Sequence, residues 1–281
     1  MNRLSLSTTS CLLFVPGNRP DRFEKAASAS PEGIVIDLED AVPVAEKDAA
    51  RRAACDYAAH VACSATAPAI YVRINPLGTR ASLDDLAALA DGRLAPTGLF
   101  LAKVEAPRDI EIVRAHDHMA RPLLVAIETA RGIARAADIA TMLGAHDALG
   151  FGGADLAADL GAAFAWEALF AGRAALVQAA AAARIGAFDV PYLDLADSAA
   201  LGAETLRVRA MGFTGKLAIH PTQVAPIRQA FQPSDAELAQ ARRIIAALDA
   251  AGGGAAQLDG KMIDLPVVLA ARRVLARRGQ K

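Results

Sequence analysis

Eight short apolar runs recur along this chain, and the segments between them place apolar residues at helical spacing. The runs cover residues 12–15, 33–38, 70–74, 99–103, 123–127, 148–151, 185–188 and 217–219. Most are continuously apolar rather than alternating, which is typical of parallel strands that are buried on both faces. Ala-rich segments such as 108–118 and 133–143 lie between the runs and predict helices. Eight strand–helix units favour a closed (β/α)8 TIM barrel over an open, doubly wound sheet.

The length and the composition agree with one barrel followed by a tail. A chain of 281 residues, 54% of them hydrophobic, can bury a single large core. No Gly-x-Gly-x-x-Gly follows the first run, which removes a dinucleotide-binding fold as the best alternative. We expect the barrel domain to span residues 1–250. Three glycines, 252–254, then open a tail, 251–281, whose last helix, 267–278, has Asp264 and Pro266 at its start.

Charge and cysteine content exclude several classes of protein. A formal net charge of −1 gives no reason to expect nucleic acid or an anionic membrane as a partner. No segment reaches about 20 uncharged apolar residues, as a membrane span requires, and the apolar run at 11–15 is too short for a signal peptide. Cys11, Cys55 and Cys63 show no metal-ligand or redox spacing, so we expect a reduced, cytoplasmic protein.

Two carboxylates follow successive apolar runs. Glu128 closes the run at 123–127, and Asp155 follows the run at 148–151 after two glycines. In a barrel of parallel strands, such residues project from the same rim. Mg²⁺ prefers oxygen ligands and often takes only one or two carboxylates from the protein. The pair therefore predicts a metal-assisted active site, and the alternative is that both carboxylates only cap the following helices.

Charged residues follow the other runs as well. They include Arg19 after the first run, Glu39 and Asp40 after the second, Arg73 in the third, Lys103 at the end of the fourth, Asp189 after the seventh and His220 after the eighth. Active sites of (β/α)8 barrels lie at the carboxyl ends of the strands, so this collection of charges at one rim predicts an enzyme. We expect His220 to be structural.

Several motifs, taken in their order along the chain, resemble those of a known family. They are LFVPGNR at 13–19, DLEDAV at 37–42, VRIN at 72–75, IET at 127–129, GGADL at 152–156, IHP at 219–221 and GKMID at 260–264. Together they span nearly the whole chain and resemble the citrate lyase β-subunit-like group of the HpcH/HpaI aldolase/citrate lyase superfamily. Members of this group cleave or form a carbon–carbon bond in a 3-hydroxyacyl thioester carried on coenzyme A (CoA) or an acyl carrier protein (ACP).

The resemblance implies a Mg²⁺-dependent barrel that forms a homotrimer or a larger homo-oligomer. It assigns Glu128 and Asp155 as the metal ligands. It also assigns Asp264 as the acid/base, which enters the site of the adjacent subunit. From the residues alone, Asp264 is more simply the N-cap of the last helix. Because of the resemblance, we favour the acid/base role of Asp264 over the N-cap role. We also expect residues 251–281 to pack on a neighbouring subunit.

Arg73, Glu39 and Asp40 complete the predicted catalytic set. The planar guanidinium of Arg73 suits a substrate carboxylate or thioester oxygen. A rim salt bridge from Arg73 to Glu39 or Asp40 is the competing interpretation. Glu39 and Asp40 either hold metal-bound waters or cap the next helix.

Arg19, Arg22 and Lys25 form a basic cluster after the first run. The phosphates of a CoA or ACP carrier need such a place, and the neighbouring backbone N–H groups would add to it. The alternative interpretation is a solvated helix face.

The sequence thus predicts a Mg²⁺-dependent lyase that cleaves a citryl-, citramalyl- or malyl-type thioester to an acyl thioester and a 2-keto acid. The alternatives are a metal-dependent aldolase acting on free hydroxy-keto acids, and a citrate lyase catalytic subunit acting on a carrier-protein thioester. Schiff-base chemistry on Lys103 would need a lowered lysine pKa, which nearby carboxylates oppose. The family commonly has Pro before this lysine and Ser after Arg173, where this chain has Ala102 and Ala174.

Overall fold

Eight parallel strands form one closed barrel in the order β1 to β8 in the computed structural model, which describes residues 5–62, 68–250 and 256–278. The strands are β1 (Cys11–Pro16), β2 (Gly33–Asp37), β3 (Ala69–Ile74), β4 (Gly98–Leu101), β5 (Leu123–Ile127), β6 (Ala148–Phe151), β7 (Gly186–Asp189) and β8 (Gly215–Ala218). Leu12 of β1 lies opposite Leu217 of β8, and this pairing closes the barrel. Each predicted apolar run overlaps a strand, and the predicted (β/α)8 barrel is confirmed.

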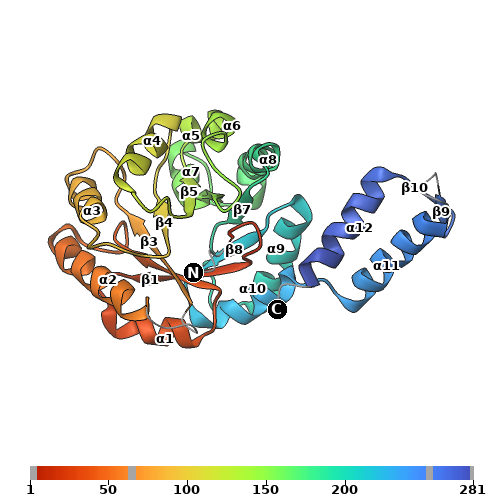
Figure 1. The fold of residues 1–281 in the computed structure, drawn as a ribbon, viewed down its shortest axis with the longest axis horizontal. Helices are drawn as coiled ribbons and strands as arrows, with labels where there is room; N and C mark the ends of the chain where they lie inside the picture. The colour runs from red at the N-terminus through yellow and green to blue at the C-terminus, as the bar shows by residue number, and fades with distance from the viewer. Residues whose placement is uncertain (1–4, 63–67, 251–255, 279–281) are drawn as a thin grey trace. The chain divides into compact units, whose positions relative to one another are not determined.

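Helices follow the strands and surround the barrel (Figure 1). They are η1 (Pro20–Arg22), α1 (Phe23–Ser28), η2 (Val44–Glu46), α2 (Lys47–Val61), α3 (Arg80–Ala90), α4 (Pro107–His116), α5 (Ala130–Ala134), α6 (Ala136–Ala140), α7 (Gly153–Leu160), α8 (Trp166–Ala183), α9 (Ser198–Met211), η3 (Pro221–Gln223) and α10 (Val224–Phe231). The prediction of one helix over 133–143 is wrong. Thr129 caps α5 through the N–H of Gly132, so this helix begins earlier, and it ends at Arg135, whose ψ of 8° leaves the helical range.

All eight strands contribute to one apolar cluster, which fills the interior of the barrel. Its buried members are Leu6, Leu12, Val35, Tyr71, Phe100, Leu124, Ala126, Ala148, Phe188 and Leu217. The strand residues among them share the parity of side chains that point inward. The next positions of this parity toward the carboxyl ends are Asp37 of β2, Arg73 of β3 and Glu128 after β5. The pleat therefore carries three charged side chains to the top of an apolar core.

The opposite parity of β7 and β8 holds a buried ion network. The Lys216 side chain is fully buried, and its Nζ donates to the carboxylates of Asp189 at 2.6 Å and Glu204 at 2.8 Å and to the carbonyl oxygen of Val190 at 2.7 Å. Asp189 also accepts a 2.8 Å hydrogen bond from Arg173 Nε. Asp189 therefore ties β7 to β8 and α8, and Lys216 ties β8 to α9 through Glu204.

The chain divides into two compact units, residues 1–228 and 229–281. In the second unit, α11 (Asp235–Ala250) packs against α12 (Leu265–Arg278), and β9 (Ala256–Leu258) pairs with β10 (Lys261–Ile263) in an antiparallel hairpin. The predicted last helix is confirmed and begins two residues earlier than expected. The three glycines at 252–254, where the tail was predicted to begin, lie outside the described residues.

Among the described residues, no helix is long and apolar enough to cross a membrane. Cys11 is buried, Cys55 is half-buried, and both carry free thiols. Cys63 lies outside the described part of the chain.

Candidate active site

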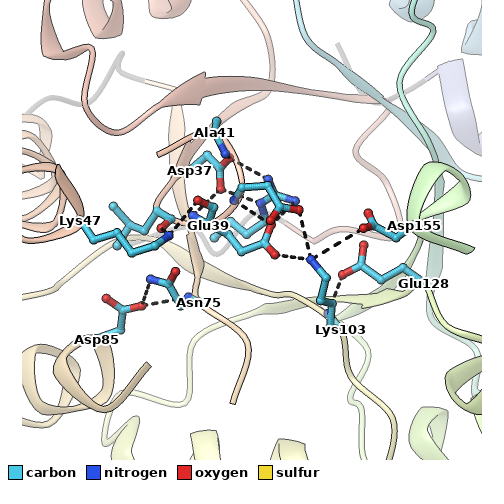
Figure 2. A network of polar contacts seen from close by, with 12 residues as sticks. Asp37, Glu39, Ala41, Lys47, Asn75, Asp85, Lys103, Glu128 and Asp155 are labelled. Carbon is cyan, nitrogen blue, oxygen red and sulfur yellow. Dashed lines mark hydrogen bonds and ion pairs between the residues drawn. The ribbon is translucent and has the colours of Figure 1, made fainter. Parts of the chain in front are cut away.

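Seven charged side chains form one network at the carboxyl ends of β2 to β6 (Figure 2). They are Asp37, Glu39, Asp40, Arg73, Lys103, Glu128 and Asp155. Five are carboxylates and two are cations, so three negative charges have no cation within the network. The strands that supply them are neighbours in the barrel, which is why residues far apart in sequence meet at one rim.

Arg73 lies at the centre of this network and is already paired. Its Nε and Nη2 donate to the carboxylate of Asp37 at 2.6 and 2.7 Å, and its Nη1 lies 3.1 Å from the carboxylate of Glu39. The guanidinium carbon lies 4.9 Å from the ring centroid of Phe14 and 6.0 Å from that of Phe100. Burial opposes the charge, but the hydrogen bonds and charges of Asp37 and Glu39 raise the pKa of Arg73 above its ordinary value. The rim salt bridge to Glu39 is therefore present.

Asp37 is a site residue that the sequence analysis missed. Its side chain is 2% exposed and accepts hydrogen bonds from the main-chain N–H groups of Glu39 at 2.9 Å and Ala41 at 3.1 Å, in addition to those from Arg73. A carboxylate at an inward position of an apolar strand requires a cationic partner. That requirement is a signal that the sequence carries, because Asp37 ends an otherwise apolar run.

Lys103 connects the two sides of the network. Its Nζ contacts the carboxylate of Glu39 and lies 3.1 Å from that of Asp40 and 3.8 Å from that of Asp155. Its main-chain N–H donates to Glu128 Oε1 at 2.6 Å. Burial lowers the pKa of Lys103, but the carboxylates outweigh it and raise the pKa above its ordinary value. A lysine held in its charged form is a poor nucleophile, which argues against the Schiff-base alternative.

Glu39 and Asp40 are held differently although they are adjacent. The side chain of Glu39 is 3% exposed and that of Asp40 is 62% exposed. The N–H of Asp40 donates to Glu39 Oε2 at 2.9 Å. Burial raises the pKa of Glu39, although its two cationic partners oppose the shift. Neither side chain caps the next helices, because Pro43 and Glu46 occupy the N-cap positions of η2 and α2.

Glu128 and Asp155, which we call the carboxylate pair, lie at the ends of β5 and β6. Glu128 is buried just beyond β5, whereas Asp155 lies half-exposed in the first turn of α7. A Cβ at Gly152 would overlap the Glu128 side chain, so only glycine lets α7 begin this close to β5. Glu128 does not cap α5, because Thr129 takes that position. Burial and the negative charge of Asp155 raise the pKa of Glu128 to about 7.

The donor set of the carboxylate pair fits a hard divalent cation. Burial first, and then the negative charge of Asp155, disfavour the ionised form of Glu128, and a bound cation would offset both. No group of three or more His, Cys, Asp or Glu side chains with metal-binding geometry was found in the described ranges. Zn²⁺ sites normally use three or four protein ligands. Mg²⁺, which keeps several waters and takes one or two carboxylates, suits the pair better.

The predicted basic cluster follows β1, with Arg19 at the N-cap of η1, Arg22 in η1 and Lys25 in α1. Arg19 forms a two-pronged ion pair with Asp21, at 2.9 Å from Nε and 2.8 Å from Nη2. Arg22 and Lys25 are exposed and form no ion pair with the residues that the structure describes. Two of the three cations are therefore available to an anionic partner.

Asp264 belongs to the second compact unit and is exposed. Its carboxylate accepts a 3.3 Å hydrogen bond from the N–H of Val267, in the first turn of α12. The residue is therefore an N-cap, as the reading from the residues alone expected. Its predicted role in the site of an adjacent subunit stays a prediction.

Comparisons with known proteins assign this arrangement to a family. Residues 10–221 match HpcH/HpaI aldolase/citrate lyase, and residues 176–278 match C-C_Bond_Lyase of the TIM-Barrel fold. The chain is 35% identical over 276 residues to the citrate lyase subunit beta-like protein of Deinococcus radiodurans, which covers 94% of this chain and 95% of that protein. It is 34% identical over 287 residues to the L-malyl-CoA/beta-methylmalyl-CoA lyase of Rhodobacter capsulatus, with coverage of 91% and 90%.

A solved structure supports the same assignment. The protein CitE from Mycobacterium tuberculosis, in complex with magnesium, acetoacetate and coenzyme A, superposes with a TM-score of 0.82 at 34% identity. The superposition covers 98% of this chain and 100% of that one. Because the family match spans most of the chain and the similarity to these relatives is nearly full-length, the chain belongs to the HpcH/HpaI aldolase/citrate lyase family.

Proposed function

We propose that this protein is a Mg²⁺-dependent carbon–carbon lyase that cleaves a 3-hydroxyacyl thioester of CoA to an acyl thioester and a 2-keto acid. The observation that carries the proposal is the carboxylate pair, which lies at the same rim of the barrel as the partly buried Arg73 and Lys103. The R. capsulatus relative is a lyase of malyl-CoA, and the M. tuberculosis relative holds magnesium and CoA.

The proposed cleavage breaks the bond between C2 and C3 of the hydroxyacyl group. The 3-hydroxyl loses its proton and becomes the keto group of the released acid. The bonding electrons pass to C2 and form the enolate of the acyl thioester, which then takes up a proton. When bound by Glu128 and Asp155, Mg²⁺ supplies a Lewis acid for the keto-acid half of the substrate.

Arg73 is proposed to bind a carboxylate or thioester oxygen of the substrate. Asp37 and Glu39 engage Nε and one N–H on each terminal nitrogen, so each terminal nitrogen keeps one further N–H. The bidentate pair with Asp37 fixes the plane of the guanidinium before a substrate arrives. Preorganised donors of this kind stabilise developing negative charge at low reorganisation cost.

Glu39 and Asp40 are proposed to hold the hydration shell of the metal. Asp40 is the more exposed of the two and presents its carboxylate beside Lys103. Arg19, Arg22 and Lys25 are proposed to bind the phosphates of CoA, for which Arg22 and Lys25 are exposed and unpaired with the described residues. A substrate carried on ACP would use the same cluster.

We also propose a homotrimer or larger homo-oligomer in the cytoplasm, in which residues 251–281 pack on a neighbouring subunit. Asp264 would then act as the acid/base of that neighbour's site. Its exposure in the second unit supports this role, because an exposed carboxylate can reach another surface. The free thiols of Cys11 and Cys55 support a reducing compartment.

The test of the lyase is keto-acid release from malyl-, citramalyl- and citryl-CoA, each with Mg²⁺ and with excess EDTA. We expect release from at least one thioester that EDTA abolishes and added Mg²⁺ restores. Release that survives EDTA would overturn the metal-dependent mechanism. Release from the free hydroxy-keto acids but from none of the thioesters would favour the aldolase alternative instead.

A further inference from the structure

A single residue, Lys103, touches every part of the proposed metal site. Its ammonium lies between Glu39 on one side and Asp155 on the other (Figure 2). The ammonium also lies 3.1 Å from Asp40, and the main-chain N–H binds Glu128. The 3.8 Å separation from Asp155 is longer than the 3.1 Å separation from Asp40. The ammonium therefore lies next to the carboxylate pair, but its shorter contacts are with Glu39 and Asp40.

We propose that Lys103 is a positioning residue that limits the affinity of the carboxylate pair for a divalent cation. Glu39 and Asp40 hold its ammonium at the edge of the pair, and its main-chain N–H orients Glu128. This inference rests on the proposed metal site, and it adds to that proposal a residue that opposes metal binding while it orders the ligands.

The backbone of Lys103 supports a positioning role. Its φ of 52° lies in the left-handed region, which residues with a Cβ adopt at a cost and keep only where their surroundings determine it. Packing and polar contacts both fix this segment. Ala102 and Val104 on either side are buried, and Val104 N–H donates to the carbonyl oxygen of Ala126 at 3.2 Å. The contacts of the Lys103 ammonium with Glu39 and Asp40 add to these.

Electrostatics gives the direction of the effect. A positive charge about 4 Å from a carboxylate repels an incoming cation by an amount that corresponds to more than tenfold in affinity at the effective dielectric of a protein surface. The two carboxylates that hold the ammonium also keep it from approaching Asp155 more closely. Loss of Lys103 should strengthen metal binding, whereas loss of Glu39 should release the ammonium toward the pair and weaken it.

The test is titration calorimetry with Mg²⁺ alone, without substrate, at one pH and one ionic strength. We expect Lys103→Met to bind Mg²⁺ more than about tenfold more tightly than the wild type, while its lyase turnover falls because Glu39 and Asp40 lose their partner. Lys103→Arg, which keeps the charge, should bind within about threefold of the wild type. Lys103→Gly removes the ammonium and tolerates the left-handed backbone, so it serves if the Met variant does not fold.

Lys47 provides a matched control. It lies at the start of α2, and its Nζ donates to the carbonyl oxygens of Leu38 at 2.8 Å and Glu39 at 2.9 Å. It forms no ion pair with a carboxylate of the described residues. Lys47→Met removes the same formal charge and should change Mg²⁺ affinity by less than about threefold. An equal gain in the Lys47 and Lys103 variants would overturn the proposal in favour of a general charge effect.

A double-mutant cycle shows whether Glu39 acts by holding the Lys103 ammonium or only through its own negative charge. If Glu39 acts by holding the ammonium, then Glu39→Gln weakens Mg²⁺ binding in the wild type but has little effect when Lys103 is already Met. If Glu39 acts only as a negative charge, the two effects add, and that result overturns the holding role. Unchanged or weaker binding by both Lys103→Met and Lys103→Gly also overturns it.

Failure of this inference is distinguishable from failure of the proposed function. Glu128→Ala must abolish Mg²⁺ binding if the metal site is correct. Retained binding by Glu128→Ala sinks the metal assignment and, with it, the role of Lys103. If Glu128→Ala loses Mg²⁺ binding but the Lys103 variants bind Mg²⁺ as the wild type does, only the proposed role of Lys103 is overturned.

Discussion

At the scale of single residues, the barrel interior depends on one close contact between neighbouring strands. Tyr71 of β3 lies opposite Gly98 of β4, and a Cβ at Gly98 would come within 2.7 Å of Tyr71 Cδ1. Tyr71 is fully buried in the central apolar cluster and cannot move aside without disturbing other strands. The Tyr71 ring therefore fits only because Gly98 has no side chain.

Gly98→Ala should therefore destabilise the protein by about 1–3 kcal/mol, because overpacking forces the ring or the strand to shift. Gly202→Ala is the matched control, since Gly202 lies within α9 and has no atom within 4 Å of an added Cβ. The control should stabilise the protein by about 0.5–1 kcal/mol through the better helix propensity of alanine. Urea unfolding measures both, and equal changes in the two variants would contradict the contact.

Glu128 gives a second residue-scale prediction, on the dependence of stability on pH. Burial and Asp155 raise its pKa to about 7 from an ordinary value of 4.5, so ionisation costs more in the folded state than in the unfolded one. The stabilising contribution of the protonated group is full below pH 4.5 and is lost as the pH rises through about 7.

Glu128→Gln keeps the acceptor for Lys103 N–H but removes the charge. In EDTA, this variant should melt at a higher temperature than the wild type at pH 8, and the difference should shrink toward pH 5. Asp56→Asn, which changes an exposed carboxylate on α2, should show no such dependence. A difference for Glu128→Gln that is constant between pH 5 and pH 8 would show that its pKa is not raised.

At the scale of elements, Asp264 at the start of α12 has two roles to be separated, a helix cap and a proposed acid/base. Asp264 caps the helix through Val267 N–H, and an asparagine can accept the same hydrogen bond. Asp264→Ala should lower the stability of the second unit by about 0.5–2 kcal/mol, whereas Asp264→Asn should lower it only slightly.

Both Asp264 variants should lose about 10²–10⁴-fold in turnover if Asp264 is the acid/base. Keto-acid release and urea unfolding, measured on the same preparations, distinguish chemistry from capping. Full turnover by Asp264→Asn would show that Asp264 caps the helix and is not the acid/base.

The elements also show what a sequence can reveal. The eight strands were predictable because parallel strands buried on both faces read as continuous apolar runs. The hairpin of β9 and β10 was not, since each strand has only three residues and β10 presents exposed Lys261 and Met262. The residues of the site were mostly predictable from their place after a strand. Asp37 and the partners of Lys103 were not, because they depend on which side chains the barrel brings together.

At the scale of the whole molecule, the proposed role of Asp264 requires a second subunit. Glu128 belongs to the first unit and Asp264 to the second. If Asp264 serves a neighbouring subunit, a mixture of Glu128→Ala and Asp264→Asn proteins should regain activity when subunits exchange, because some sites then combine two intact parts.

Glu128→Ala mixed with Asp155→Ala is the matched control for this experiment. Both changes lie in the first unit and affect the same site, so no exchange of subunits can restore it. Recovery in the first mixture alone is the expected result. No recovery in either mixture, with exchange verified by mass spectrometry of the intact assembly, would show that the site is not shared.

The closed barrel also contains its own chemical reporter. The amine of Lys216 is completely enclosed and is bonded to Asp189, Glu204 and the carbonyl oxygen of Val190. Acylating reagents can reach it only when β8 separates from β7 and the surrounding helices. The rate at which this one lysine is acylated, followed by peptide mass spectrometry, therefore measures how often the native barrel opens. The exposed lysines of the same chain record the reagent dose in the same sample.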